Sequence, residues 1–148
     1  MKEINLQQIV DLDVLQNIQD EFSNATGLSA ITVDFRGIPM TRYSNFTPFC
    51  KLIRKNKIYR ERCYRCDAYG GVEATRRKDP YIYRCHTGLA DFAIPIKIQG
   101  QFIGSVLAGQ AKLDESEQPQ LQKIIPEKTN WEEDKILVEA YENLPITS

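Results

Sequence analysis

Near the start of the chain, apolar residues recur at the spacing of one face of an α-helix. Asp13 and Gln16 form a capping box at its beginning, and Gly27 supplies a C-terminal stop. The pattern predicts an amphipathic helix of about three turns. Its apolar stripe, which is expected to pack against another element, consists of Val14, Leu15, Ile18 and Phe22.

The pattern then changes to that of a sheet. Residues 28–33 predict a strand, residues 34–37 a turn, and residues 38–43 the returning strand of a hairpin. Residues 47–78 are helix-like again. The double glycine at 70–71 is predicted to separate two helices, because glycine weakens a helix interior.

The second half of the chain contains the clearest hairpin. Residues 81–86 predict a strand, and residues 91–98 and 101–108 predict two more around a turn at 99–100. Pro95 cannot donate to a strand ladder, which indicates a sheet edge or a bulge at that position. Helices are predicted over residues 115–122 and 131–141.

These elements define a fold class. Strands in hairpin pairs, with a helical insert between the second and the third, predict a mixed α/β domain of the α+β type. We expect an antiparallel five-stranded sheet with flanking helices, in a single domain that spans residues 1–148.

Composition and charge narrow the function classes. The chain is 42% hydrophobic and 26% charged, close to an average globular protein. Nineteen basic against twenty acidic residues give a net charge of -1, which removes the global electrostatic argument for direct binding to nucleic acid. No apolar run approaches a signal peptide or a membrane span, so we expect a cytoplasmic location without membrane contact.

The cysteines are the first candidate chemistry: Cys50, Cys63, Cys66 and Cys85. The Cys63-x-x-Cys66 pair places two sulfurs on one helix face, and the other two could complete a zinc or iron–sulfur site. In that case all four sulfurs should lie within a few ångström of one another. Two alternatives remain open, namely cysteines packed in the core and a redox-active dithiol. The basic residues between positions 51 and 65 are expected to lower thiol pKa values.

A second group of residues suggests a binding pocket. His86, the only histidine, is either a hydrogen-bonded structural residue or a ligand contact, and Asp91 is either a ligand anchor or the start of a strand. Tyr43 and Phe49 could line an apolar pocket or belong to the core. Cys85 and His86 are neighbours on a predicted strand, so they point to opposite faces and cannot form a catalytic dyad. Without a nucleophile elbow or a second histidine, the sequence does not favour an enzyme.

Several segments together resemble a known family, the sensory domain named after PocR, the regulator of propanediol use. The similar segments are residues 45–50, 63–67, 81–96, 100–104 and 108–110, together with the turn at Gly37. The composite motif Cys-His-x-Gly-Leu-x-Asp at residues 85–91 is the specific part. The resemblance covers roughly residues 8 to 146.

The resemblance implies a PAS-like fold that senses a small hydrocarbon derivative, such as a short diol, for an output domain. The implied output domains are helix-turn-helix activators and sensor histidine kinases. The positions that match the family motifs are Cys50, Cys63, Cys66, Cys85, His86, Gly88 and Asp91.

We therefore expect a ligand-sensing domain without catalytic activity. The alternative is a cysteine-ligated metal or iron–sulfur redox sensor. Because both ends of the chain carry an apolar helix stripe, we also expect a homodimer built from terminal helices, or else a monomer whose terminal helices complete its own core.

Overall fold

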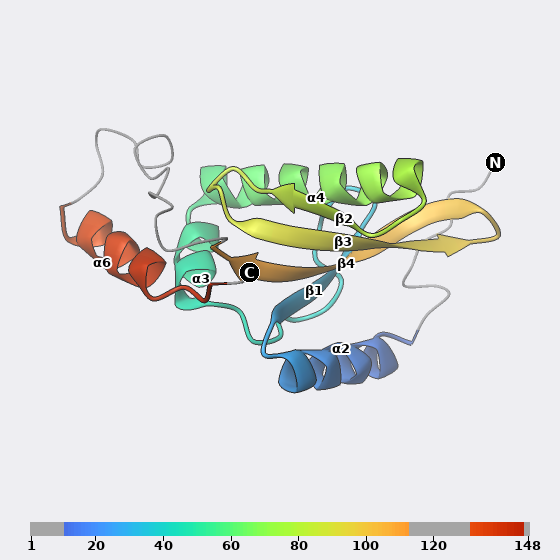
Figure 1. Cartoon of the computed structure of the whole chain (residues 1–148), viewed down its shortest axis with the longest axis horizontal. Helices are drawn as coiled ribbons and strands as arrows, with labels where there is room; N and C mark the ends of the chain where they lie inside the picture. The colour runs from blue at the N-terminus through green and yellow to red at the C-terminus, as the bar shows by residue number, and fades with distance from the viewer. Residues whose placement is uncertain (1–10, 113–130, 147–148) are drawn as a thin grey trace.

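The computed structural model describes residues 11–112 and 131–146 of the chain, and within them the sheet has four strands. They are β1 (Ser29–Asp34), β2 (Tyr81–Arg84), β3 (Ala90–Ile98) and β4 (Gln101–Ala111). Their order is β1-β4-β3-β2, and every neighbouring pair is antiparallel (Figure 1). The mixed, antiparallel class predicted from the sequence is thus confirmed.

Helices cover both faces of this sheet. Helix α2 (Leu12–Thr26) lies on one face, and the long helix α4 (Lys57–Arg77) lies on the other (Figure 1). The short helix α3 (Pro48–Lys55) and helix α6 (Trp131–Glu142) pack together at one end. The predicted terminal helices are present, while the helix predicted over residues 115–122 lies outside the described residues. No described helix combines the length and the apolarity needed to cross a bilayer.

The fifth predicted strand, residues 38–43, is not formed in the described structure. This segment meets β1 at an isolated bridge between Val33 and Pro39, and a second bridge joins Ala30 to Ser44 just beyond it. The N–H of Met40 also donates to the carbonyl of Thr32 at 2.8 Å, but no continuous ladder forms. Pro39 has no N–H to donate to a ladder. The N–H of Arg42 donates to the side chain of Gln16 at 2.7 Å instead of to a strand. The segment is therefore an irregular strap that lies between β1 and α2.

The two central helices separate at a different place from the one predicted. The break is at Asn56, whose side chain caps α4 by accepting from the N–H groups of Ile58 and Tyr59. Gly70 and Gly71 lie inside α4. A methyl group at Gly70 would come within 2.5 Å of the Tyr83 ring, and one at Gly71 would meet Ser105. The glycines therefore allow α4 to approach the sheet closely, rather than ending a helix.

The strands of the second half differ from the prediction mainly in length. β2 ends at Arg84, and residues 85–88 turn back, with the N–H of Cys85 donating to the carbonyl of Leu89 at 3.0 Å. The β3–β4 hairpin is confirmed, with the turn at Gln99 and Gly100 as predicted. Pro95 pairs only with Ser105 of β4, because β2 reaches no further than Ala93 along β3. The local sheet edge predicted from Pro95 is therefore present.

Helix α2 is packed in an unexpected way. Its fully buried residues are polar, namely Gln16, Gln19 and Ser23, whereas Val14 and Ile18 of the predicted apolar stripe are exposed. Its N-cap is Asp11, which accepts from the N–H of Asp13, so the predicted capping box is not used.

At the other end of the chain, Leu137 and Tyr141 of α6 are buried in a core cluster with Phe49.

Candidate ligand-binding site

A small cavity, partly open to solvent, lies where α3, α4 and three strands meet. Its volume is about 20 Å³, room for about one water molecule. Polar residues are concentrated around it although it is inside the protein. The lining residues are Ser29, Ile31, Phe46, Arg54, Asp67, Asp91, Leu107, Ala108 and Gln110.

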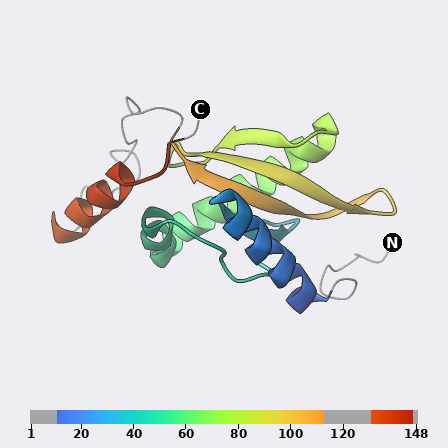
Figure 2. The ribbon, with the colours of Figure 1, turned by 60° about the horizontal axis from the view of Figure 1, so that its bottom comes forward.

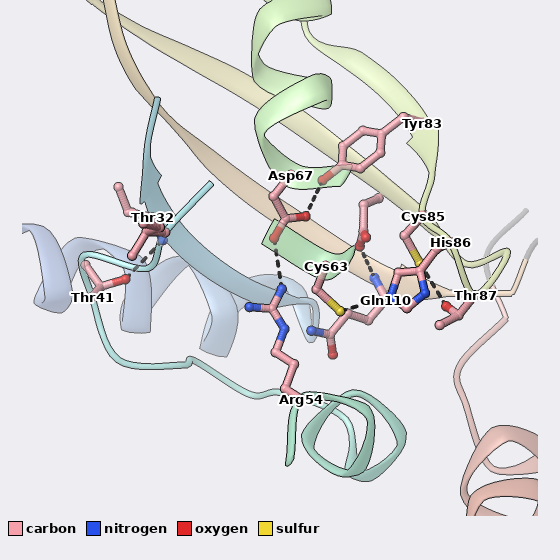
Figure 3. A network of polar contacts seen from close by, with 12 residues as sticks. Thr32, Thr41, Arg54, Cys63, Asp67, Tyr83, Cys85, His86, Thr87 and Gln110 are labelled. Atoms are coloured by element: carbon pink, nitrogen blue, oxygen red, sulfur yellow. Dashed lines mark hydrogen bonds and ion pairs between the residues drawn. The ribbon is translucent and has the colours of Figure 1, made fainter. Parts of the chain in front are cut away.

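A buried ion pair forms one wall of the cavity. The Nη2 atom of Arg54 lies 2.9 Å from Oδ2 of Asp67, and the side chains are only 8% and 6% exposed. The hydroxyl of Tyr83 donates to the other carboxylate oxygen of Asp67 at 2.9 Å (Figure 3). Burial opposes the charge on Arg54, but neighbouring Asp67 outweighs it and the pKa of the guanidinium is raised. Arg54 therefore stays cationic.

The other terminal nitrogen of this guanidinium, Nη1, is buried and makes no hydrogen bond to any residue that the structure describes. A buried, unpaired donor is costly, and in folded proteins such groups usually find a partner. Because Arg54 lines the cavity, a bound molecule is one way to satisfy this donor.

Asp91, at the start of β3, also lines the cavity. Burial, followed by the nearby carboxylate of Asp67, raises the pKa of Asp91 to about 7. Its Oδ1 atom accepts from the N–H of Gln110 at 2.7 Å. The strands are irregular at this point, because the register shifts between Ala90 and Asp91 and Gly109 adopts a φ of 137°. A side chain at Gly109 would collide with Asp91, so the glycine makes room for the carboxyl group.

Gln110 ties this strand to the start of α3. Its Oε1 atom accepts from the N–H and the hydroxyl of Thr47, at 2.9 Å and 3.0 Å. Thr47 in turn caps α3 by accepting from the N–H of Cys50. Gln110 itself has a φ of 63°, in the left-handed region that residues other than glycine rarely adopt. Strained backbone of this kind is concentrated at functional sites.

Two stacked aromatic rings close the cavity on a third side. Phe46 lines it, and Tyr43 stacks on Phe46 with ring centroids 4.0 Å apart and an interplanar angle of 3°. The guanidinium of Arg54 lies over both rings, 5.2 Å from the Phe46 centroid and 5.6 Å from that of Tyr43. Tyr43 is 39% exposed and forms the outer layer.

A neighbouring group contains the cysteines and His86. All four thiols are free. Sγ of Cys63 lies 3.2 Å from Nε2 of His86, and Sγ of Cys85 lies 2.8 Å from the hydroxyl of Thr87 (Figure 3). Cys66 interacts with the backbone N–H of His86, and Cys50 packs against both core clusters.

Burial controls the ionisation of this group. It raises the pKa of Cys63 and that of Cys85 to about 12, and it also raises those of Cys50 and Cys66. The expectation that nearby basic residues would lower the thiol pKa values is therefore wrong, because the loss of hydration is the larger effect. Burial, followed by the charges of Arg62 and Arg54, lowers the pKa of His86 to about 4. At neutral pH the group consists of neutral thiols and a neutral imidazole.

The cysteines are not arranged as a metal site in the described part of the chain. There, no group of three or more histidine, cysteine, aspartate and glutamate side chains is placed to hold a metal ion. The thiols are nevertheless close enough for Cys63 to interact electrostatically with Cys66 and Cys85. The sulfurs are thus gathered in one region without forming a preorganised ligand set.

The predicted pocket residues are distributed over three places. Asp91 lines the cavity, and Tyr43 lies one layer outside it, behind Phe46. Phe49 is completely buried in the core cluster, where its ring meets Tyr141 edge to face. His86 is in the cysteine group, and its Nδ1 atom is buried without a partner among the described residues.

Of the cavity's lining residues, Asp91 is the one that was predicted as a ligand contact in the sequence analysis; the polar residues Arg54, Asp67 and Gln110 were not. Arg54 belongs to a basic run, which is most often a solvated helix face. One signal was available, because Asp67 directly follows the Cys63-x-x-Cys66 pair on a helix. An arginine and an aspartate on successive helices can pair, but the spacing alone does not show that they do.

Comparison with known proteins places the chain among the sensory domains of regulatory proteins. Residues 8–148 match the family described as "Sensory domain found in PocR", and the chain belongs to that family. Among curated proteins it is similar to "Regulatory protein PocR" of Salmonella typhimurium, with 38% identity over 133 residues. The resemblance stated from the sequence is thus confirmed.

The match to the Salmonella protein covers 90% of this chain but only 43% of that protein, so the chain spans less than half the length of this relative. No solved structure matches the chain.

Proposed function

We propose that this domain is the ligand-sensing part of a bacterial transcription-regulatory or signal-transduction protein. It binds a small hydrocarbon derivative, such as a short diol, in the cavity between Arg54 and Asp91. The observation that carries the proposal is the buried Nη1 atom of Arg54, which lacks a hydrogen-bond partner among the described residues and belongs to a side chain that lines the cavity together with Asp91.

The charges around the cavity favour a neutral ligand with hydroxyl groups. Arg54 and Asp67 neutralise each other, and Asp91 is close to half protonated at neutral pH because its pKa is about 7. A hydroxyl oxygen can accept from Arg54, and a hydroxyl proton can be donated to Asp91. An anionic ligand would meet the carboxyl groups of both Asp67 and Asp91, which disfavours it.

Binding without turnover is part of this proposal. The cavity contains no nucleophile beside a general base, since the thiols have raised pKa values and the imidazole contacts Cys63 outside the cavity. The matched family is a family of regulatory sensory domains rather than of enzymes.

We also propose that the sensory domain is linked to an output domain in a longer protein, because the chain spans only 43% of its Salmonella relative. The proposed output domain is either a helix-turn-helix activator or a histidine kinase. The sheet with helices on both faces is compatible with the PAS-like class. We further propose a cytoplasmic location and a homodimer through α2, whose Val14 and Ile18 are exposed.

Calorimetric titration with propane-1,2-diol tests the binding site. The wild-type chain should bind the diol saturably. Asp91→Ala should weaken binding by roughly 10- to 100-fold, the effect of losing a hydrogen bond to an ionisable group. The matched control is Asp79→Ala, at an exposed position outside the cavity lining, and it should bind like wild type. An Asp91→Ala variant with wild-type affinity would exclude this cavity as the site.

A second candidate function is a cysteine-ligated zinc or iron–sulfur sensor. The specific observation in its favour is that four thiols and His86 gather around residues 85–87. In this reading Cys50, Cys63, Cys66 and Cys85 would hold the metal, and binding would have to deprotonate and rearrange the thiols.

Metal analysis and an absorption spectrum of anaerobically purified protein test this second candidate. One zinc per chain or the colour of an iron–sulfur cluster, lost in Cys63→Ser, would support it. Metal-free protein that binds the diol with full affinity would contradict it.

A further inference from the structure

The cavity has room for about one water molecule, so a wall must move before it can hold a diol inside. Most of the lining residues belong to the sheet or to α3 and α4, where ladders, helical hydrogen bonds and the Arg54–Asp67 pair hold them. Of the lining residues that the structure describes, Phe46 is the one outside a helix or strand. It lies in the connection between β1 and α3, just beyond the strap, and its ring is therefore the wall that can open.

The backbone on each side of Phe46 is anchored. Ser44 forms paired backbone hydrogen bonds with Ala30, and Thr47 donates to Gln110. Asn45 has a φ of 53°, a left-handed conformation that asparagine adopts more readily than most residues. Because its neighbours are held, Phe46 opens the cavity by turning its side chain, and the Tyr43 ring stacked on it must move as well.

The two residues that flank Tyr43 are attached to α2 by buried glutamines. The N–H of Arg42 donates to Oε1 of Gln16 at 2.7 Å, and Nε2 of Gln19 donates to the carbonyl of Arg42 at 2.9 Å. Nε2 of Gln19 also donates to the hydroxyl of Ser44 at 2.7 Å. The strap runs beside α2 (Figure 2), so displacing the Tyr43 ring pulls on this helix.

The part of α2 that faces β3 and β4 has room for movement. Gln19 holds the helix to β1 by donating to the carbonyl of Ala30 and accepting from the hydroxyl of Thr32. Beside this attachment lies an apolar pocket of about 140 Å³, with Ile18 and Phe22 on the helix side and Phe92 and Ile94 on the strand side. A helix held by hydrogen bonds on one flank and bordered by a void on the other can shift when its anchor moves.

We propose that the Tyr43–Phe46 stack is the gate of the cavity and that its opening moves α2 through Gln16 and Gln19. This inference rests on the proposed function, that is, on ligand binding between Arg54 and Asp91. Phe46 then limits ligand entry, and α2 is the element that transmits the bound state.

The gate is tested by the association rate of propane-1,2-diol, measured by NMR line-shape analysis. If the open form is a minor state populated at about 10% or less, Phe46→Ala should raise the association rate about tenfold or more. The matched control is Phe35→Ala, a phenylalanine that is 40% exposed, lies in the same connection between β1 and α3 and does not line the cavity. An unchanged rate in Phe46→Ala would overturn the gate.

The link to α2 is tested by hydrogen exchange of residues 12–26 with and without saturating diol. Wild type should show a ligand-dependent change in these amides, and Gln19→Leu should lose most of it. Since Gln19→Leu can lower stability, Ser44→Ala serves as a milder variant that should show a partial loss. The control is Ser23→Ala, which removes a buried hydroxyl of α2 without a partner among the described residues.

The outcomes separate this inference from the function on which it rests. Exchange that changes around the cavity but not in residues 12–26, with diol bound, would overturn the link and leave the proposed function standing. Absence of binding in both wild type and Phe46→Ala would reject the proposed function, and this inference with it.

Discussion

Asp91 is the residue whose chemistry depends most on its surroundings. In the unfolded chain its carboxyl group is expected to have an ordinary pKa of about 4, whereas in the folded protein the pKa is about 7. The folded state therefore binds the proton more tightly than the unfolded state does. By linkage, the contribution of Asp91 to stability is most favourable below pH 4 and is lost as the pH rises through 7.

Replacing Asp91 by Asn should remove this dependence. The Asn side chain keeps an oxygen to accept from the N–H of Gln110 but cannot ionise. We expect Asp91→Asn to be more stable than wild type at pH 8, by about 1 to 3 kcal/mol, with the difference shrinking toward pH 4. Urea unfolding between pH 4 and 8 measures it. A difference that is constant over this range would show that Asp91 has an ordinary pKa.

The environment of Asp91 could be anticipated from the sequence only in part. Its position before an apolar strand, within the motif at residues 85–91, identified it as a candidate. Its partners could not be identified, because Arg54 and Asp67 come from helices far from it in sequence and meet it only after the sheet has formed. Tertiary contacts between distant polar residues leave no periodic signal.

At the scale of elements, the long helix α4 depends on close contact with the sheet. Gly70 lies against Tyr83, a side chain that is only 5% exposed and is held by its hydrogen bond to Asp67. The ring therefore cannot move aside easily. This contact joins the packing of α4 to the buried ion pair of the cavity.

Gly70→Ala should accordingly destabilise the protein. Alanine favours a helix over glycine by up to about 1 kcal/mol, but overpacking costs about 1 to 3 kcal/mol and disturbs the Tyr83–Asp67 bond. We expect Tm to fall by roughly 5 °C. Val72→Ala, an exposed position on the same helix, is the control and should change stability by less than about 0.5 kcal/mol. A Gly70→Ala variant with raised Tm would mean that α4 does not pack this closely.

The elements also show where sequence patterns succeed and where they fail. The β3–β4 hairpin and the terminal helices have strong local signals, and the structure has them where they were predicted. The prediction that the double glycine separates two helices was wrong. Glycines can either break a helix or let a helix approach a neighbouring element closely, and only the position of the sheet shows which role applies. Residues 38–43 have the apolar content of a strand, but they meet β1 without a continuous ladder, and side chains of α2 take the backbone hydrogen bonds of Arg42.

At the scale of the whole molecule, the two terminal helices differ in what they leave exposed. Leu137 and Tyr141 of α6 are buried in the core of the same chain, so this helix meets the expectation for a monomer. Helix α2 exposes Val14 and Ile18 beside the apolar pocket on the sheet. Helix α2 is therefore the helix through which we expect the domain to dimerise.

Light scattering over a concentration series tests this assignment. We expect a dimer whose mass falls to that of a monomer in Ile18→Glu, because burying an unpaired charge at an interface is unfavourable. Ile136→Glu, at a similarly exposed isoleucine of α6, is the control and should remain dimeric. Wild-type protein that stays monomeric at high concentration, with and without diol, would leave the dimer without support.

The binding of a small hydroxyl-bearing molecule between Arg54 and Asp91 is tested most directly by a crystal structure of the chain grown with propane-1,2-diol. We predict that one hydroxyl oxygen lies within about 3 Å of Nη1 of Arg54 and the other within about 3 Å of the Asp91 carboxyl group, with the Phe46 ring displaced. Diol bound elsewhere, with the Phe46 ring unmoved and Nη1 of Arg54 unpaired, would contradict the proposed site.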